Sequence, residues 1–187
     1  MDTLLEQHLR TEQLFQGRVI NLRRDTVVLP NGKEATREVV EHPGAVAVVP
    51  VLSDGRIVMV RQYRHAAGKI LLEIPAGKLD KGEEPQKCAT RELEEEIGYQ
   101  CQQLHKLAAV YTTPGFSNEI IHIYLAEQLV QTVQQLDEDE FLHIETYTKE
   151  ELRHGPRHLD WSLSHHSVRL PKRVLSFQLN LHSLLKS

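Results

Sequence analysis

The 187-residue sequence contains no run of about 18 apolar residues, the length that a membrane-spanning helix requires. Its first residues, MDTLLEQHLRTEQ, are charged and lack the apolar centre of a secretory signal peptide. Internal repeats and low-complexity tracts are also missing from the sequence. From these absences we expect one compact domain in the cytoplasm, with no membrane partner.

Cysteine is scarce, and charge of either sign is not in large excess. The only cysteines, Cys88 and Cys101, provide neither a disulfide framework nor the CxxC spacing of a zinc site, and we expect both to be reduced thiols. Charged residues make up 26% of the chain and leave a formal net charge of −4. This balance is that of an ordinary globular protein and indicates no nucleic-acid partner.

Much of the sequence has the pattern of β-strands. Apolar or alternating segments bounded by turn residues occur at 18–41 (around Pro30-Asn31-Gly32), 45–52, 56–64, 69–77 (ending at Pro75 and Gly77), 107–129 and 141–148. The Ser53-Asp54-Gly55 turn predicts that the second and third segments form a β-hairpin at the core of the sheet. Pro114-Gly115 predicts a loop that divides 107–129 into two strands, and a short helix is expected near Thr148.

A polar, glycine-containing loop and then a helix are expected after the fourth of these segments. Pro85 suits the first turn of a helix, and Ala89, Leu93 and Ile97 recur at helical spacing. Gly98 supplies a natural stop. The sequence therefore predicts strand, loop and helix in immediate succession.

RELEEEIG, residues 91 to 98, concentrates four glutamates in the expected helix. On a helix Glu92, Glu95 and Glu96 share a face apart from the apolar residues, and each like-charged pair costs about 0.2–0.5 kcal/mol. Hard divalent cations prefer carboxylate oxygens, so the cluster suggests a metal site. The alternative is a merely solvated acidic face, which we do expect for Glu94.

The spacing of the residues around this cluster resembles the signature of the Nudix hydrolase family. The matching residues are Gly77, Glu83, Arg91-Glu92-Leu93, Glu95-Glu96 and Gly98. Tyr99 departs from the pattern, because an aliphatic residue is usual there. The resemblance implies the α+β Nudix fold, a mixed β-sheet sandwiched between α-helices, with antiparallel strands at the N-terminus.

Members of this family hydrolyse a nucleoside diphosphate linked to another moiety, using Mg²⁺ or Mn²⁺ held by the helix carboxylates. The resemblance implies that Glu92 and Glu96 are the main metal ligands in this sequence. It also implies that the Ala76 carbonyl is a further ligand, and that Glu95 is a ligand or a residue that positions water.

Gly77, Glu83 and Arg91 are expected to support this site. A solvated acidic face would leave these three residues unexplained. A carboxylate at Glu83 that pairs with the Arg91 guanidinium would lock the loop onto the helix and fix the geometry of the metal ligands.

Residues outside the signature point to one branch of the family. Pro114-Gly115, within YTTPGFSNE, resembles the downstream marker of the ADP-ribose pyrophosphatase branch. By the same resemblance, Arg37 and Arg64 hold the substrate diphosphate and ribose, and Glu73 contacts the nucleotide. A solvated surface position is the alternative for each arginine.

The acidic stretch LDEDEF, residues 136–141, precedes a predicted strand. In the branch just named, a loop at this point brings a glutamate over the metal cluster, and Glu140 is our first candidate, with Glu138 second. The glutamate would bind a third cation or accept a proton from the attacking water, on a mobile loop that closes over substrate. A solvated acidic loop is the alternative.

The resemblance extends over about residues 10 to 150. It implies a homodimer in which N-terminal strands are exchanged, so residues 1–43 are the candidate dimer segment and 44–187 the Nudix domain. The last 35 residues contain one acid, six Lys or Arg, and five of the eleven histidines. For this tail a surface helix, an aberrant sequence and a metal-binding His165-His166 pair remain open.

Three functional hypotheses follow from the resemblance. The first is a Mg²⁺-dependent ADP-ribose pyrophosphatase that yields AMP and ribose 5-phosphate. The second is the same chemistry on another nucleotide, such as a nucleotide sugar, a dinucleoside polyphosphate or an oxidised nucleoside triphosphate. The third is a sensor of ADP-ribose or NAD-related ligands without hydrolysis, which the intact Glu92, Glu95 and Glu96 disfavour.

Overall fold

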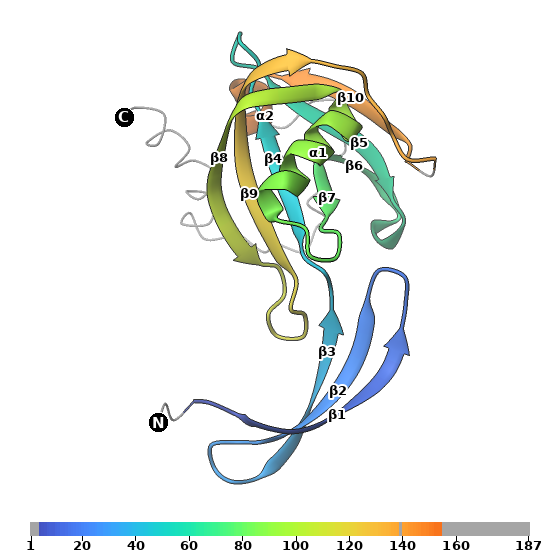
Figure 1. Ribbon diagram of the computed structural model, residues 1–187, viewed down its shortest axis with the longest axis vertical. Coiled ribbons are helices and arrows are strands. Elements are labelled where there is room, and N and C mark those ends of the chain that lie inside the picture. The colour runs from blue at the N-terminus through green and yellow to red at the C-terminus, as the bar shows by residue number, and fades with distance from the viewer. Residues whose placement is uncertain (1–3, 139, 155–187) are drawn as a thin grey trace. The chain divides into compact units, whose positions relative to one another are not determined.

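The computed structural model describes residues 4–138 and 140–154 (Figure 1). The elements in chain order are β1 (Gln7–Gln16), β2 (Asn21–Val28), β3 (Glu34–Glu41), β4 (Ala45–Pro50), β5 (Ile57–Arg64), the 3₁₀-helix η1 (His65–Ala67), β6 (Lys69–Glu73), β7 (Ala76–Lys78), α1 (Pro85–Ile97), β8 (Tyr99–Tyr111), β9 (Ile120–Gln131), β10 (Leu142–Tyr147) and α2 (Lys149–His154). In this part of the chain, α1 is the one long helix.

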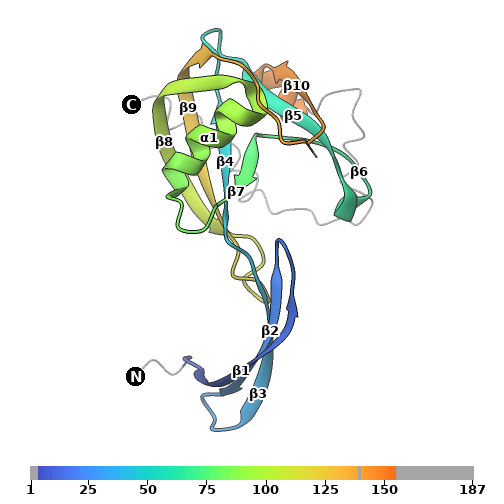
Figure 2. The ribbon, with the colours of Figure 1, turned by 45° about the vertical axis from the view of Figure 1, so that its right-hand side comes forward.

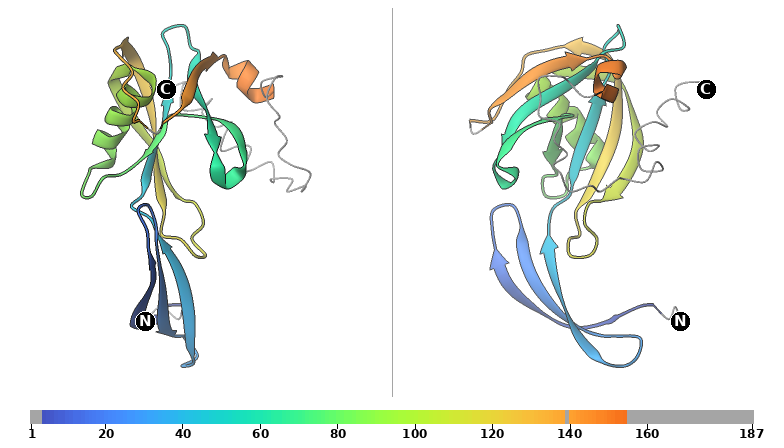
Figure 3. Two further views of the ribbon diagram at one scale, coloured as in Figure 1. Left: turned by 90° about the vertical axis from the view of Figure 1, so that its right-hand side faces the viewer. Right: turned by 180° about the vertical axis from the view of Figure 1, so that it is seen from behind.

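The described strands form three sheets. β1, β2 and β3 form an N-terminal antiparallel sheet, β5 lies between β10 and β6, and the order of the third sheet is β7-β4-β9-β8. This third sheet is mixed, because β4 and β9 run parallel while its other pairs are antiparallel. The left view in Figure 3 separates it from β5, β6 and β10. The predicted α+β class, mixed sheet and N-terminal antiparallel strands are confirmed.

Helix α1 packs against the four-stranded sheet (Figure 2). Ala89, Leu93 and Ile97, predicted to face the core, are at most 2% exposed and join a cluster with valines of β4 and β5 and with Tyr124 of β9. Full burial of a leucine or isoleucine side chain contributes about 1.5–3 kcal/mol. Gly98 ends the helix as predicted, in the left-handed conformation with φ +67°. Apolar burial thus fixes the position of α1.

The predicted β-hairpin between 45–52 and 56–64 is wrong. Its turn is present, with Gly55 at φ +84°, but the two strands share an isolated bridge between Val51 and Ile57 and then belong to different sheets. Each strand is central in its own sheet, with β7 and β9 beside β4, and β10 and β6 beside β5. Because other strands occupy both edges, no ladder between β4 and β5 can form.

The strand predicted over 69–77 is two strands in two sheets. β6 pairs with β5, whereas β7 pairs with β4. Pro75 lies between them and has no N–H for a sheet, while its carbonyl accepts a hydrogen bond from the Val48 N–H at 2.9 Å. The chain therefore changes sheets at Pro75, and β7 comes to lie against α1.

The apolar pattern does not predict β1, whose ten residues are all exposed. The contact of β1 with β2 is partly polar: Asp25 is 7% exposed and accepts hydrogen bonds from the Thr11 hydroxyl at 2.7 Å and from Arg23 Nε at 3.0 Å. The bond from Thr11 and the charge and bond of Arg23 lower the pKa of Asp25. Hydrophobic periodicity misses β1 because apolar burial does not hold it.

The other predicted elements are present. β8 and β9 are divided by the Pro114-Gly115 loop, although β8 begins at Tyr99 rather than near residue 107. β10 and α2 match the predicted strand over 141–148 and the short helix after it. Both cysteines are free thiols, as expected.

Two further expectations concern the membrane and the tail. Among residues 4–138 and 140–154, no helix combines the length and apolar character needed to cross a membrane. The histidine-rich tail, including the predicted alternatives for His165-His166, lies outside the described residues.

Candidate active site

Helix α1 carries Glu92 and Glu96 into the interior of the protein. Their exposed fractions are 7% and 3%, whereas Glu95 is half-buried. The sequence predicts that these three glutamates share a face apart from the apolar residues; it does not predict that two of them are buried. They are buried because β7 packs against this side of α1. Two buried carboxylates on one face need donors or a cation nearby.

Gly77 of β7 makes room for the Glu92 carboxyl group. A Cβ at residue 77 would lie 1.8 Å from Cδ of Glu92 and 1.9 and 2.2 Å from its carboxylate oxygens. These separations are far below van der Waals contact, so Glu92 can hold this position only against glycine. The first position of the signature therefore has a steric reason in this structure.

We expect Gly77→Ala to displace the Glu92 carboxylate and to lower kcat about 100-fold, since a misplacement near 1 Å has an effect of that size. The added methyl group should cost about 1–3 kcal/mol of stability, which leaves the protein folded. Steady-state kinetics and thermal unfolding measure the two effects. Lys78→Ala is the control, because the exposed Lys78 contributes its main-chain carbonyl to the site. A Gly77→Ala enzyme with wild-type kcat would contradict the steric explanation.

Glu96 lies at the centre of the electrostatics of the site. Its Oε2 accepts a hydrogen bond from the Ala76 N–H at 3.0 Å. Burial raises the pKa of Glu96 to about 8; the Glu92 and Glu140 carboxylates also raise it, while the Ala76 N–H and the Arg64 charge act in the opposite direction. Burial likewise raises the pKa of Glu92. Negative charge at these positions is costly in the absence of a nearby cation.

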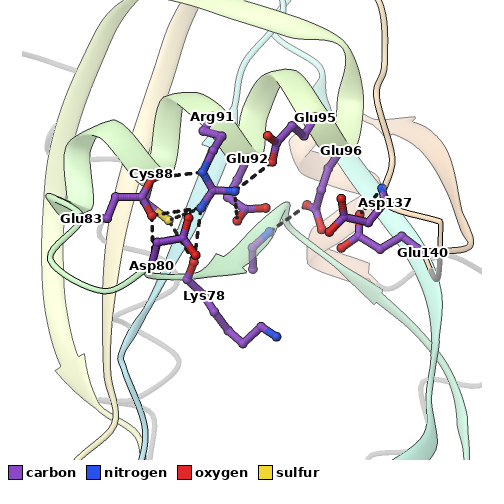
Figure 4. Close-up of polar contacts among 11 residues, drawn as sticks. Lys78, Asp80, Glu83, Cys88, Arg91, Glu92, Glu95, Glu96, Asp137 and Glu140 are labelled. Atoms are coloured by element: carbon purple, nitrogen blue, oxygen red, sulfur yellow. Dashed lines mark hydrogen bonds and ion pairs between the residues drawn. The ribbon is translucent and has the colours of Figure 1, made fainter. Parts of the chain in front are cut away.

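Arg91 fixes the preceding loop to α1 (Figure 4). Its Nε donates to Oε1 of Glu83 and its Nη2 to Oε2, both at 3.0 Å, so the predicted ion pair is confirmed in a two-bond form. The Asp80 N–H adds a third bond to Glu83, also at 3.0 Å. These contacts, the Arg91 hydrogen bonds first, lower the pKa of Glu83 to about 2.

Arg91 also makes contacts that the sequence does not predict. Its Nη1 donates to Glu92 Oε1 at 2.9 Å and to Glu95 Oε2 at 2.8 Å, and its Nη2 donates to the Lys78 carbonyl at 3.3 Å. The hydrogen bonds to Glu83 raise the pKa of Arg91, so the guanidinium stays charged. One guanidinium therefore orients three glutamates at once.

Cys88 is a further neighbour of Arg91, and sequence reasoning treats it as an ordinary thiol. It is fully buried, its Sγ donates to the Lys78 carbonyl at 3.4 Å, and Arg91 Nη2 lies 3.3 Å from the sulfur. Burial raises the pKa of Cys88 to about 12. The group is therefore a neutral thiol that packs beside Arg91, not a nucleophile.

The acidic loop between β9 and β10 brings Glu140 towards the helix carboxylates. Its charge contributes to the raised pKa of both Glu92 and Glu96, and Figure 4 shows Glu140 and Asp137 beside Glu96. The Asp137 N–H donates to Glu140 Oε2 at 3.4 Å, and the Glu140 N–H donates to the Asp137 carbonyl at 3.0 Å. Sequence reasoning missed Asp137, although it lies in the same acidic stretch. The second candidate, Glu138, is exposed.

Two of the predicted substrate residues form a pair near Glu96, and a third does not join them. Arg64 Nε on β5 donates to Glu73 Oε2 on β6 at 2.9 Å, and the Arg64 charge lowers the pKa of Glu96. Arg37 on β3 pairs instead with Glu6, through its Nε at 3.1 Å. Within the described residues its contacts lie in the N-terminal segment, so this single chain does not bring Arg37 to the carboxylates.

The loop of Pro114-Gly115 connects to the N-terminal sheet. The Val40 N–H, in β3, donates to the Phe116 carbonyl at 2.7 Å, and the Asn118 N–H donates back to the Val40 carbonyl at 3.2 Å. In the described part of the chain the hydrogen bonds of residues 112–119 are with Val40 and His42, at the end of β3 and just after it, and among themselves. The structure does not bring Pro114-Gly115 to the helix carboxylates.

The glutamate carboxylates of this site are suitable ligands for a hard divalent cation, although their oxygens do not converge on a single point. Among residues 4–138 and 140–154, no three acidic, histidine or cysteine side chains have ready metal-ligating geometry, and Arg91 holds two of the carboxylates. Glu92, Glu95, Glu96 and Glu140 nevertheless offer only oxygen, and their charges repel. Mg²⁺ and Mn²⁺ prefer such ligands, so the chemistry of these residues fits these ions.

Comparisons with known proteins give the same family as the signature residues. The family model described as "NUDIX domain" matches residues 41–166, and the one described as "Nucleoside diphosphate sugar hydrolase N-terminal domain" matches residues 6–40. The chain belongs to the Nudix family. It keeps the glycines, glutamates and arginine of the signature and is a Nudix hydrolase.

The curated relatives are close in sequence. The chain is 50% identical to "ADP-ribose pyrophosphatase" of Bacillus subtilis (strain 168) over 153 residues, which cover 81% of this chain and 83% of that protein. It is 51% identical to "Methanol dehydrogenase activator" of Bacillus methanolicus over 148 residues, or 78% of this chain and 80% of the relative. A solved structure titled "Crystal structure of ADP compounds hydrolase" has the same fold, with a TM-score of 0.76 at 22% identity over 100% of this chain and 97% of the other.

Proposed function

We propose that the protein is a Mg²⁺-dependent or Mn²⁺-dependent ADP-ribose pyrophosphatase that yields AMP and ribose 5-phosphate. The observation that carries this proposal is the buried carboxylate pair of Glu92 and Glu96, held against β7 beside the Arg91–Glu83 pair. The identity of 50% with an ADP-ribose pyrophosphatase supports the choice of substrate.

Glu92 and Glu96, together with Glu95 and the Ala76 carbonyl, are the proposed ligands of the cations. When bound, divalent ions supply charge neutralisation at the diphosphate and lower the pKa of the attacking water. Gly77 leaves space for one of these carboxylates, and Arg91 keeps the helix and its loop in register.

The proposed reaction is attack of water on one phosphorus of the diphosphate. A new P–O bond forms, the bridging P–O bond breaks, and the other phosphate leaves. Glu140 is the proposed acceptor of the proton from water, because its side chain lies beside Glu96 (Figure 4); Glu138 is the second candidate. A role for Glu140 as ligand of a further cation is the alternative.

The proposed substrate residues are Arg37, Arg64, Glu73, Pro114 and Gly115. Arg64 offers a guanidinium whose charge acts on Glu96 and whose position is held by its bond to Glu73. Arg37 and the Pro114-Gly115 loop lie on or beside the N-terminal sheet, so we propose that they act on substrate in a homodimer.

The N-terminal sheet supports the proposed homodimer. Seven apolar side chains of residues 1–43 are 37–81% exposed, namely Leu4, Leu5, Leu9, Leu14, Phe15, Val19 and Ile20. Exposed apolar side chains concentrated in one segment are typical of interfaces. Residues 1–43 therefore remain our proposed dimer segment. A cytoplasmic location is also proposed, supported by the two free cysteines.

The test of function is a substrate panel with Mg²⁺, Mn²⁺ or a chelator, read by identification of the products. ADP-ribose with either cation should give AMP and ribose 5-phosphate, and the chelator should abolish the reaction. Hydrolysis in H₂¹⁸O identifies the attacked phosphorus from the labelled product. Cleavage of a nucleotide sugar or a dinucleoside polyphosphate, with ADP-ribose intact, would replace the proposed substrate while keeping the chemistry.

A further inference from the structure

The segment after β9 closes the C-terminal end of α1. The Thr132 N–H donates to the Gly98 carbonyl at 2.7 Å, and the Gln135 N–H donates to the Glu95 carbonyl at 3.0 Å. Between them, the Gln134 side chain donates through Nε2 to the Glu96 carbonyl at 2.6 Å. The last carbonyls of a helix have no partner within the helix. Residues 132–135 supply the partners here.

Gly98 permits this close approach. A Cβ at residue 98 would lie 2.8 Å from the Gln134 nitrogen and 3.3 Å from its Cα, and the glycine has φ +67°. A side chain there would be strained and would displace the segment from the helix. The final glycine of the signature thus allows the loop to reach the helix carbonyls.

The same segment leads directly to the acidic loop. Asp137 follows Gln135 by two residues, and Glu140 is bonded to Asp137 through the main chain. The Glu96 carbonyl that Gln134 binds belongs to the residue whose carboxylate lies beside Glu140 in Figure 4. The bonds of residues 132–135 therefore connect the helix carboxylates with the loop that carries the proposed base.

We propose that Gln134 is a positioning residue, which sets where Glu140 lies relative to Glu92 and Glu96. Two of the three bonds come from the main chain and survive most substitutions, whereas the third depends on the Gln134 amide. Without that amide the loop stays attached but is less restrained at Glu96, and Glu140 spends less time in reach of the attacking water. This inference rests on the proposed function, because it assigns Glu140 to the reaction.

The test compares four variants with wild type. Gln134→Ala removes the donor, Gln134→Glu keeps the shape but presents an acceptor, and Gln134→Lys restores a donor at a helix end that favours positive charge. Gln135→Ala is the matched control, since it keeps the main-chain N–H and, in the described residues, its side chain makes no hydrogen bond. We expect kcat for ADP-ribose to fall about 10-fold in the Ala and Glu variants with KM within about twofold, and to recover in part in the Lys variant.

A readout in the metal-free protein separates this inference from the proposed function. Hydrogen exchange over residues 132–140 should be faster in the Ala and Glu variants than in wild type and Gln135→Ala, whereas the unfolding midpoints should agree. If wild type does not cleave ADP-ribose, the proposed function fails, while hydrogen exchange still tests the linkage. If wild type is active and both variants match the Gln135→Ala control in kcat and exchange, the positioning role is overturned. The positioning role would also be overturned if the unfolding midpoints of Gln134→Ala and Gln134→Glu fell together with kcat, and if Gln134→Lys restored neither.

Discussion

Glu96→Gln is expected to lower kcat/KM for ADP-ribose by about 10³-fold, a loss of about 4 kcal/mol in transition-state stabilisation. The amide fills the same space and still accepts a hydrogen bond from the Ala76 N–H, but it has no charge with which to hold a cation. Because burial disfavours the ionised carboxylate, the metal-free variant should be at least as stable as wild type. Steady-state kinetics with Mg²⁺ and thermal unfolding with a chelator measure the two effects.

Glu94→Gln is the matched control for this experiment. It makes the same chemical change on the same helix, where Glu94 accepts a hydrogen bond from Gln100 at 2.9 Å outside the carboxylate cluster. Its activity should stay within about twofold of wild type, in line with a surface substitution. Mg²⁺ should raise the unfolding midpoint of wild type and of Glu94→Gln more than that of Glu96→Gln. Full activity in Glu96→Gln would refute the metal assignment.

Arg91→Met should destabilise the protein by about 2–4 kcal/mol and lower its unfolding midpoint by about 5–10 °C. The substitution keeps much of the apolar stem but removes the bonds to Glu83, Glu92 and Glu95, of which the first two are mostly buried. Arg91→Lys should recover only part of the loss, because an ammonium group has no two-bond fork for Glu83. Urea unfolding of the metal-free proteins gives the free energies.

The loss of stability in Arg91→Met is expected to depend on pH. Glu83 has its pKa lowered to about 2, so its pairing contributes stability above its ordinary pKa and loses that contribution as pH falls towards 2. The stability difference between wild type and Arg91→Met should therefore shrink below about pH 4. A double-mutant cycle with Glu83→Gln isolates the pair. A coupling energy near zero at pH 7 would contradict the assigned role of Arg91.

Local patterns were sufficient for the elements that depend on near neighbours in the chain. Helix α1 with its end at Gly98, the break at Pro114-Gly115 and the glycine turn at residue 55 all follow from backbone preferences of single residues or from spacing along one helix. The pairing of strands did not follow in the same way. A turn predicts that two strands approach, but β9 pairs with β4 and β10 pairs with β5, and both partners come from segments far away in the sequence.

The site divides in the same way. The Arg91–Glu83 pair could be predicted because a charged loop residue and a charged helix residue stand at a recognisable spacing. The contributions of Cys88, Asp137 and Gln134 could not, since they depend on burial or on the return of a distant loop to α1. An amide donor in a polar stretch gives no sequence signal that a helix carbonyl will be its partner.

The sequence by itself determined the family and the helix that presents Glu92, Glu95 and Glu96, because one turn of helix fixes which side chains share a face. Only the tertiary structure decided that Glu92 and Glu96 are buried against Gly77 and Ala76 of β7. The physical reason is that burial and hydrogen-bond partners arise from contacts between segments distant in the chain. Such contacts do not produce a periodic pattern of residues in the sequence.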